Sequence, residues 1–364
     1  ALAILHRMQM DYTVALARFE ESLTIYREQR DQKGVAQILG NLGTIQDDQG
    51  NSAAAATFYE ESLSLYRQLN NKGGIALMLS YLGGAAQAQG DLARARELLE
   101  EGLMLHRELG VQYRIAWDLL VLGNIISLQG DLVQAETLGE ESMLHARELG
   151  DRDQIAWTYN FQGRLALRWG DNLRAQALFQ ESLSLFREID DKLGEATTLQ
   201  DLGETAFQQG ELVFARSQLE ESLSLLKKRQ YNPGIARTLC KLGSVAYAQN
   251  DTAAGRMLFT ECLPLFTELN NKAGMLEALN ALAFAMRSHD LSFAVSLWGA
   301  IQTLRDRLGI FLIPREKTPH EEQLNQVRST LGEDAYTIAW NTGRAQTWEQ
   351  TADYALEKLG ETAR

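Results

Sequence analysis

The sequence predicts an all-α protein built as a stacked array of about eight helical hairpins. Two short motifs recur in step with one another about every 40 residues, and only four prolines interrupt 364 residues. A repeat of this length indicates an array in which each unit buries its apolar face against its neighbours. One motif is a Glu-Ser-Leu-like triplet, which begins at Glu21, Glu61, Glu101, Glu141, Glu181, Glu221 and Glu261.

The second motif is a Gly-Asp-like pair that marks a turn between two helices. Gly50 is suited to end a first helix, here called helix A, because glycine adopts the left-handed conformation at low cost. Asn51 and Ser52 are suited to cap a second helix, helix B. Within residues 33–72 the apolar side chains follow helical spacing in both segments. We therefore expect two helices of about 16 to 18 residues per unit, joined by short turns as antiparallel neighbours.

Three positions of each unit keep their size, and they form the predicted core slots. Helix A carries a small residue in mid-helix, and helix B carries a small residue followed four positions later by a large one. The mid-helix residues are Gly43, Gly83, Gly123, Gly163, Gly203, Gly243 and Ala283. The large ones are Phe19, Tyr59, Leu99, Phe179, Leu219, Phe259 and Trp298, with Gly139 as a departure. Trp298 is therefore interpreted as structural.

This pattern resembles the tetratricopeptide repeat over about residues 1–308. The period of 40 exceeds the family's usual length of about 34, so the helices are expected to be longer. The resemblance implies a right-handed superhelical solenoid whose helices A line a concave groove. Residues 309–364 break the period and are expected to form a C-terminal helical cap, which such an array needs at its open end.

The C-terminal run carries a second resemblance. Leu297-Trp298-Gly299-Ala300, Leu331-Gly332-Glu333, Ala339-Trp340 and Gly343-Arg344 occur in that order. This order resembles the end of large bacterial regulators that join an effector domain, a STAND-class nucleotide switch and a tetratricopeptide array, many of them LuxR-type or SARP-type transcriptional regulators. The resemblance implies a sensor half that controls oligomerisation of a nucleotide-binding half outside this chain. It is also compatible with an anti-phage or death-like switch.

The composition argues against some classes of partner. The net charge is −13 and no basic stripe is visible, so we expect no direct contact with nucleic acid. No apolar run reaches the roughly 18 residues of a membrane span. Cys240 and Cys262 lie in helical patterns and are interpreted as small buried residues, consistent with a reducing cytoplasm. Residues 1–5 already read as mid-helix, so we expect a fragment whose first hairpin is truncated.

Catalytic signatures are missing from the sequence, so we expect no enzyme, no cofactor and no metal. There is no P-loop, no zinc spacing and no nucleophile elbow. His106 and His145 are interpreted as surface or boundary residues. The recurring glutamates of helix B are expected to form a solvated outer face, paired with Arg67, Arg107, Arg147, Arg187 and Lys227.

The predicted binding surface is the groove side of helix A, because positions there vary from unit to unit while the core slots do not. Aromatic faces stack on sugars, bases or peptide side chains, and amides and guanidinium groups fix orientation. The candidate residues are Trp117, Leu120, Asn124, Trp157, Asn160, Arg164, Arg168, Gln200, Glu204 and Tyr247. The alternative, that Trp117 and Trp157 only pack between consecutive helices A, stays open.

The function expected from the sequence is a non-catalytic sensor or protein-interaction module. It would bind a protein, a peptide or a small-molecule inducer in the groove and regulate an attached nucleotide-switch or DNA-binding effector. Oligomers would form through the full-length protein. The alternative is a generic scaffold array that recruits a partner peptide.

Overall fold

The computed structural model describes residues 12–361, and in this range it contains 18 helices and no strand. The all-α prediction is confirmed, whereas the expected start of the first hairpin, at residues 1–5, lies outside the described residues. The helices before the C-terminal region are α2 (Tyr12–Glu28), α3 (Gln32–Asp48), α4 (Ser52–Gln68), α5 (Lys72–Gln89), α6 (Leu92–Leu109), α7 (Gln112–Leu128), α8 (Leu132–Leu149), α9 (Arg152–Trp169), α10 (Asn172–Glu188), α11 (Lys192–Gln208), α12 (Leu212–Arg229), α13 (Asn232–Ala248), α14 (Thr252–Glu268) and α15 (Lys272–Met286).

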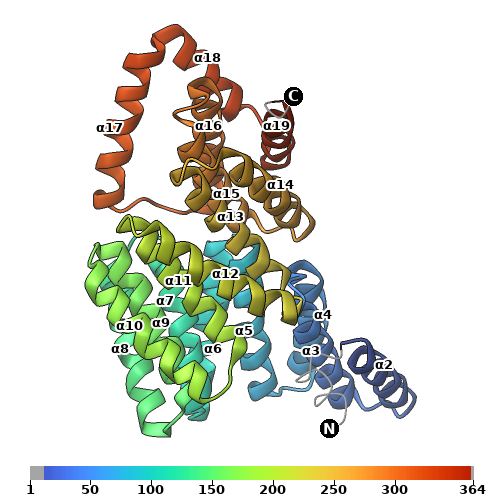
Figure 1. Cartoon of the computed structure of the whole chain (residues 1–364). Helices are drawn as coiled ribbons and strands as arrows, with labels where there is room; N and C mark the ends of the chain where they lie inside the picture. The colour runs from blue at the N-terminus through green and yellow to red at the C-terminus, as the bar shows by residue number, and fades with distance from the viewer. Residues whose placement is uncertain (1–11, 362–364) are drawn as a thin grey trace. The chain divides into compact units, whose positions relative to one another are not determined.

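The chain divides into two compact units, and each is described by itself. Unit 1 comprises residues 1–126, 133–155 and 229–231, and unit 2 comprises residues 127–132, 156–228 and 232–364. Within each unit consecutive helices form antiparallel pairs, as the succession of ribbons in Figure 1 shows. The predicted helix lengths are confirmed, because α3 to α14 have 17 or 18 residues each.

Each hairpin turns where the sequence motif predicts. Gly170, after α9, has a φ of 83°, which is the left-handed region that glycine enters at low cost. The side chain of Asp171 then accepts a hydrogen bond of 3.0 Å from the backbone N–H of Arg174 and caps α10. Asn51 occupies the equivalent cap position before α4, but its side chain makes no capping hydrogen bond.

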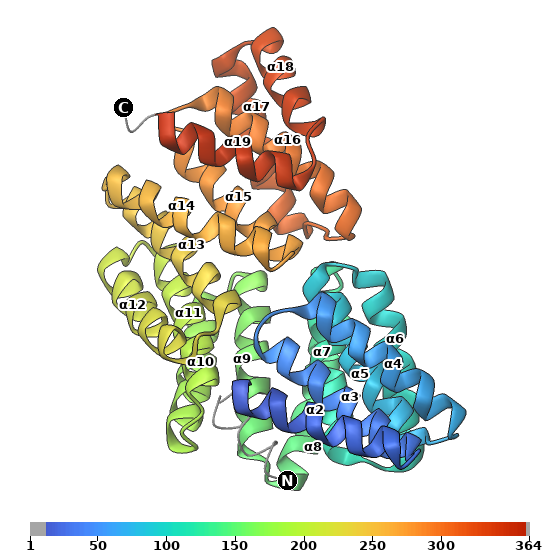
Figure 2. The same ribbon diagram turned by 90° about the vertical axis from the view of Figure 1, so that its right-hand side faces the viewer.

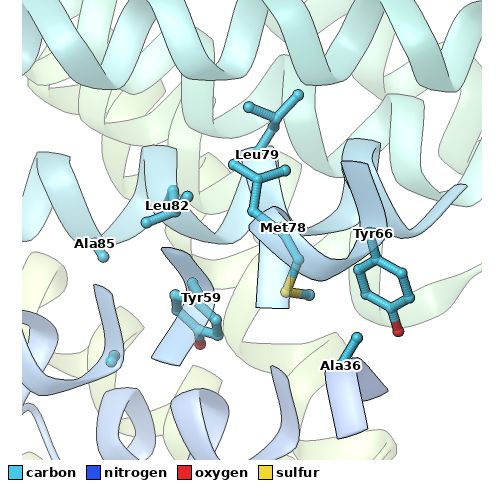
Figure 3. Packing of buried hydrophobic residues seen from close by; sticks show 9 residues of the cluster. Ala36, Tyr59, Tyr66, Met78, Leu79, Leu82 and Ala85 are labelled. Carbon is cyan, nitrogen blue, oxygen red and sulfur yellow. The ribbon is translucent and has the colours of Figure 1, made fainter. Parts of the chain in front are cut away.

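The core slots interlock as their sizes predict. A Cβ added to Gly43 of α3 would lie 2.5 Å from Cε1 of Tyr59, so the ring of α4 rests directly on the glycine. Gly163 of α9 and Phe179 of α10 repeat the contact at 2.6 Å in unit 2. Figure 3 shows Tyr59 in the cluster of buried side chains from α3, α4 and α5. The mid-helix glycines thus let large side chains of helix B approach helix A.

The serine of the recurring triplet has a structural role. Ser62, Ser142, Ser182 and Ser222 each donate a hydrogen bond of 2.7 to 2.9 Å to a helix A carbonyl 26 residues earlier. All four serines are buried. Each hydroxyl therefore fastens helix B to helix A within one hairpin, at a net value of about 1 kcal/mol per bond.

The charged outer face of helix B is also confirmed. Arg187 of α10 lies 2.8 Å from Glu221 of α12, 34 residues onward, and Arg67 and Arg107 pair in the same way within unit 1. These side chains are roughly half exposed. Each pair is therefore worth only about 0 to 1 kcal/mol.

The C-terminal region of unit 2 contains α16 (Leu291–Leu308), α17 (Pro314–Leu331), α18 (Glu333–Arg344) and α19 (Trp348–Glu361). Helix α19 packs against α14, α15 and α16, and Figure 2 shows it in front of α16. Trp298 of α16 is 1% exposed, which confirms its structural assignment. The boundary between repeats and cap at residue 308 stays a prediction.

Candidate functional site

The helix A face of unit 2 carries seven of the predicted site residues. Helix α9 supplies Trp157, Asn160, Arg164 and Arg168, α11 supplies Gln200 and Glu204, and α13 supplies Tyr247. Residues four apart on a helix lie on one side of it, so Arg164 and Arg168 face the same way. Trp117, Leu120 and Asn124 lie on α7 in unit 1 and are described separately below.

Two predicted amides are buried and join consecutive helices A. Asn160 is 2% exposed, and its Nδ2 donates to Oδ2 of Asp201 at 3.0 Å and to Oγ1 of Thr198 at 3.3 Å. Gln200 repeats the arrangement one unit later, where its Nε2 donates 2.8 Å to the carbonyl of Gly234. Both donors are used within the chain. These two side chains therefore fix the stacking of α9, α11 and α13 and offer little to a ligand.

An ion pair crosses from α11 to α13 on the same face. Glu204 lies 2.8 Å from Nζ of Lys241, and both side chains are partly exposed. The attraction of Lys241 lowers the pKa of Glu204 despite the opposing effect of burial. Burial works against the charge on Lys241, but attraction to Glu204, Glu277 and Asp201 outweighs it and the pKa of Lys241 is raised. Both groups are therefore charged near neutral pH.

The remaining aromatic candidates in unit 2 are packing residues to different degrees. Tyr247 is buried, with its ring near Phe259 and His289, and its hydroxyl donates to Sδ of Met286 at 3.5 Å. Its predicted place on the groove surface is thus corrected, because the ring fills the space left beside Gly255. Trp157 is half-buried and meets Phe186 of α10 edge to face at 5.0 Å. Trp157 is therefore at least in part a packing residue.

Arginine 168 is occupied by a distant part of the chain. Its Nε and Nη2 donate to the two carboxylate oxygens of Glu316 in α17 at 3.1 and 3.0 Å. Its Nη1 donates to the carbonyl of Ser127 and, at 3.2 Å, to the hydroxyl of the same residue. Arg315 donates to the last carbonyls of α9, those of Leu167 and Arg168, each at 3.3 Å. Sequence reasoning missed this contact, since its partners are 148 residues apart.

Arginine 164 differs from Arg168, one turn away. It is exposed, and within residues 12–361 it has neither an ion pair nor a hydrogen bond from its side chain. No three histidine, cysteine, aspartate or glutamate side chains in that range gather as metal ligands would. Arg164 thus presents an exposed positive charge on α9.

In unit 1 the candidates on α7 are less accessible than expected. Leu120 is buried, Trp117 is half-buried, and Nδ2 of Asn124 donates 3.3 Å to the carbonyl of Leu120. His106 of α6 is only 2% exposed, and its Nδ1 lies 2.7 Å from Oδ2 of the buried Asp118 of α7. The interpretation of His106 as a surface or boundary residue was wrong. Periodicity alone does not show which polar residue finds a buried partner on the next helix.

Comparison with known families decides what the array is. A tetratricopeptide repeat model matches residues 1–68, 113–188 and 170–228, more than half of the chain, and a second one matches residues 75–109. The chain belongs to the tetratricopeptide repeat family. In the part that the structure describes, no helix of this tetratricopeptide array is long and apolar enough to cross a bilayer.

Two solved structures share the fold of this tetratricopeptide protein. A Rap protein complexed with competence and sporulation factor has a TM-score of 0.65 at 14% identity, over 84% of this chain and 87% of that one. The Rap conjugation gene regulator of plasmid pLS20, in complex with the Phr* peptide, also has a TM-score of 0.65 at 14% identity, over 78% of this chain and 76% of that one. BtubC (BKLC) from P. vanneervenii has a TM-score of 0.45 at 19% identity, over 60% of this chain and 91% of that one. No curated protein matches the chain.

Proposed function

We propose that this tetratricopeptide array is a non-catalytic interaction module that binds a peptide segment on the helix A face of unit 2. The observation that carries the proposal is the exposed guanidinium of Arg164, which has no ion pair or hydrogen bond within residues 12–361 and lies two turns along α9 from the half-buried Trp157. A peptide would place apolar or aromatic side chains against the indole and a carboxylate against the guanidinium. One Rap protein of the same fold is described in complex with the Phr* peptide, which supports this choice of ligand class, and another in complex with competence and sporulation factor.

The buried amides of this face give the binding surface a fixed shape. Asn160 and Gln200 tie α9 to α11 and α11 to α13, so the exposed side chains project from helices that are already in place. A surface ordered before binding loses less conformational entropy when the ligand arrives. Asn160, Gln200 and Tyr247 thus act in this proposal as supports, and Trp157, Arg164, Arg168 and Glu204 as contacts. For unit 1, taken by itself, Trp117 and Asn124 are proposed as contacts and Leu120 as a support.

A selection from a random peptide library displayed on phage tests the proposal. Peptides enriched on the folded chain are synthesised, and their affinity is measured by fluorescence polarisation. We expect Arg164→Ala to weaken binding about tenfold, which corresponds to about 1.4 kcal/mol. The matched control is Arg216→Ala on helix B, where the guanidinium pairs with Glu220 at 2.8 Å.

Two outcomes contradict the proposal. Either no peptide is enriched on the folded chain, or the enriched peptides bind the Arg164→Ala variant as tightly as the unaltered chain. A thermal-shift screen with sugars and nucleotides checks the small-molecule alternative, since a ligand at 100 times its dissociation constant adds about 2.7 kcal/mol. A shift with those compounds alone would assign the face to a small-molecule inducer.

We further propose that binding regulates an attached nucleotide-switch or DNA-binding effector, with residues 309–364 as the cap of the array. Support comes from the order of motifs between residues 297 and 344 that resembles STAND-type regulators of the LuxR and SARP classes. The alternative is a scaffold array that only recruits a partner peptide. The surrounding coding sequence distinguishes them: a P-loop and a helix-turn-helix in the same gene support a regulator, and their absence supports the scaffold.

A further inference from the structure

We infer that Arg168 is a carboxylate-binding site that the chain fills with its own Glu316, so that residues 309–316 compete with a ligand carboxylate for α9. This inference rests on the proposed function and adds the chemistry of the ligand. The ligand class is an acidic peptide, with either an Asp or Glu side chain or a free C-terminal carboxylate in the place of Glu316.

The geometry at Arg168 is that of carboxylate recognition. Its Nε and Nη2 meet both oxygens of Glu316 side by side, which is the bidentate arrangement that guanidinium groups form with carboxylates. The side chains are 20% and 32% exposed, so the pair is shielded but solvent still reaches it. The charge of Arg305 on α16 also acts on Glu316. A carboxylate at this position is therefore attracted by two arginines, Arg168 and Arg305.

Arginine 168 is held in place by contacts other than Glu316. Its Nη1 donates to the carbonyl and the hydroxyl of Ser127, a buried residue at the end of α7. These bonds remain when Glu316 departs. The guanidinium is therefore already oriented for an incoming carboxylate, which lowers the entropic cost of binding one.

The segment that delivers Glu316 has few other attachments. The N–H of Phe311 donates 3.2 Å to the carbonyl of Leu128, Ile313 is buried beside Gly130, and Arg315 reaches the end of α9. Phe311 itself is 57% exposed. Toward α7 and α9 this short strap is held by one backbone bond, one apolar side chain and the charged contacts of Arg315 and Glu316, so a ligand can displace it.

The rest of the C-terminal region does not depend on this strap. In α17 the one side chain classed as buried among residues 315–331 is Val327, far along the helix from Glu316. Helix α18 packs on α16 through Gly299 and Gly343, away from residues 309–316. Release of the strap therefore leaves the core of the region intact.

Charge identifies the second feature of the ligand. Arg164 lies one turn before Arg168, which is about 6 Å along the helix axis. It has no acidic partner within residues 12–361, while Arg168 has one. A ligand with two acidic groups at about that spacing would satisfy both guanidinium groups, whereas the strap satisfies only one. This difference gives the ligand its advantage over the internal competitor.

A peptide supplied in trans tests the inference without knowledge of the natural ligand. The probe has the sequence of residues 308–319, with both ends blocked so that Glu316 supplies its sole carboxylate, and carries a fluorophore. Its affinity is measured on the unaltered chain and on the Glu316→Gln variant. The internal strap is present at millimolar effective concentration, so it competes strongly with a free peptide. We expect the probe to bind Glu316→Gln at least tenfold more tightly.

Matched controls separate the carboxylate from general effects. A probe with glutamine in place of its glutamate should bind the Glu316→Gln variant with at least tenfold lower affinity. Glu321→Gln removes a charge from α17 that faces Lys317 at 3.7 Å, and it should leave probe affinity unchanged. Hydrogen exchange of the Phe311 amide should accelerate in Glu316→Gln and stay unchanged in Glu321→Gln.

The inference is overturned if the probe binds both chains equally, if its glutamine version binds as well, or if no binding to Glu316→Gln is seen at millimolar concentration. The proposed function is tested separately with peptides from the phage selection. If such a peptide binds at Arg164 and the Phe311 amide keeps its protection, the inference fails and the proposed function stands. If no peptide is selected but the probe behaves as expected, the proposed function fails and the internal carboxylate site remains.

Discussion

Alanine at Gly343 should detach α18 from α16. A Cβ added at Gly343 would lie 1.8 Å from the carbonyl oxygen of Ser296 and 3.0 Å from the backbone nitrogen of Ala300. The shorter distance is about 1.6 Å less than ordinary van der Waals contact. Because both atoms belong to the backbone of α16, no change of rotamer relieves the clash. The two helices must separate, which exposes the buried side chains of Tyr336 and Ala339.

The magnitude follows from three terms. Overpacking costs about 1 to 3 kcal/mol, and partial exposure of the Tyr336 ring adds about 1.5 to 3 kcal/mol. Alanine recovers about 1 kcal/mol through its better helix propensity. The net loss is about 3 kcal/mol, and it falls on the C-terminal region because each part of an array contacts mainly its neighbours. Amides of α18 should then exchange about a hundredfold faster.

Hydrogen exchange monitored by mass spectrometry resolves this local effect better than a global melt, since arrays need not unfold in two states. The control is Gly84→Ala in α5, where an added Cβ meets no atom within 4 Å. This control should stabilise its helix by about 1 kcal/mol. If Gly343→Ala left the exchange of residues 333–344 unchanged, the reasoning from close backbone contact would be refuted.

Three further predictions concern single side chains. Ser182→Ala removes the buried hydroxyl that donates to the carbonyl of Ala156 and should lower stability by about 1 to 2 kcal/mol. The amides of α9 and α10 should then exchange faster with solvent, and unchanged exchange would contradict this prediction. The protein atoms that surround the carboxyl, and next the charge of Asp48, raise the pKa of Asp47 to about 6 although its side chain still touches solvent, so the folded state holds a proton that the unfolded state loses near its pKa of 3.8. The free energy of unfolding of unit 1 should therefore fall as pH rises from 4 to 6. Because solvent still reaches Asp47, Asp47→Asn should restore less than about 1 kcal/mol at pH 7. The urea midpoint of this variant should change less between pH 4 and 6 than that of the unaltered chain. The contact with Cys240, together with burial, holds the pKa of Cys262 well above its usual range, so iodoacetamide at pH 8 should label it only after unfolding, and fast labelling of the folded chain would count against that burial.

The repeat pattern was readable from the sequence because it depends on neighbours within one hairpin. Gly163 and Phe179 are 16 residues apart, and their size match recurs in most units, so periodicity alone placed them together. The triplet serines recur for the same reason, although their bond to a helix A carbonyl became visible only in the structure. Local spacing therefore predicted the hairpins, their lengths and their core slots.

The candidate site was only partly predictable. Variation between units marked Arg164, which is exposed, and Trp157, which is half-buried and packs on Phe186 of its own hairpin. The same variation also marked Asn160, which is buried and bonded to the next hairpin, and Tyr247, whose ring is buried against Gly255 and Phe259 of its own hairpin. A position that varies because it adapts to its neighbour looks the same in one sequence as a position that varies because solvent tolerates it.

By itself the sequence determined an all-helical tetratricopeptide array with a 40-residue period, because that information repeats and acts over short distances. The tertiary structure alone decided which side chains of the predicted groove are exposed and which are buried. Glu316 reaches Arg168 across 148 residues, and α18 meets α16 backbone to backbone at Gly343. Contacts of this kind occur once and join distant segments, so a periodic pattern does not predict them. They form only when the chain has folded and its last helices pack onto the helices that precede them.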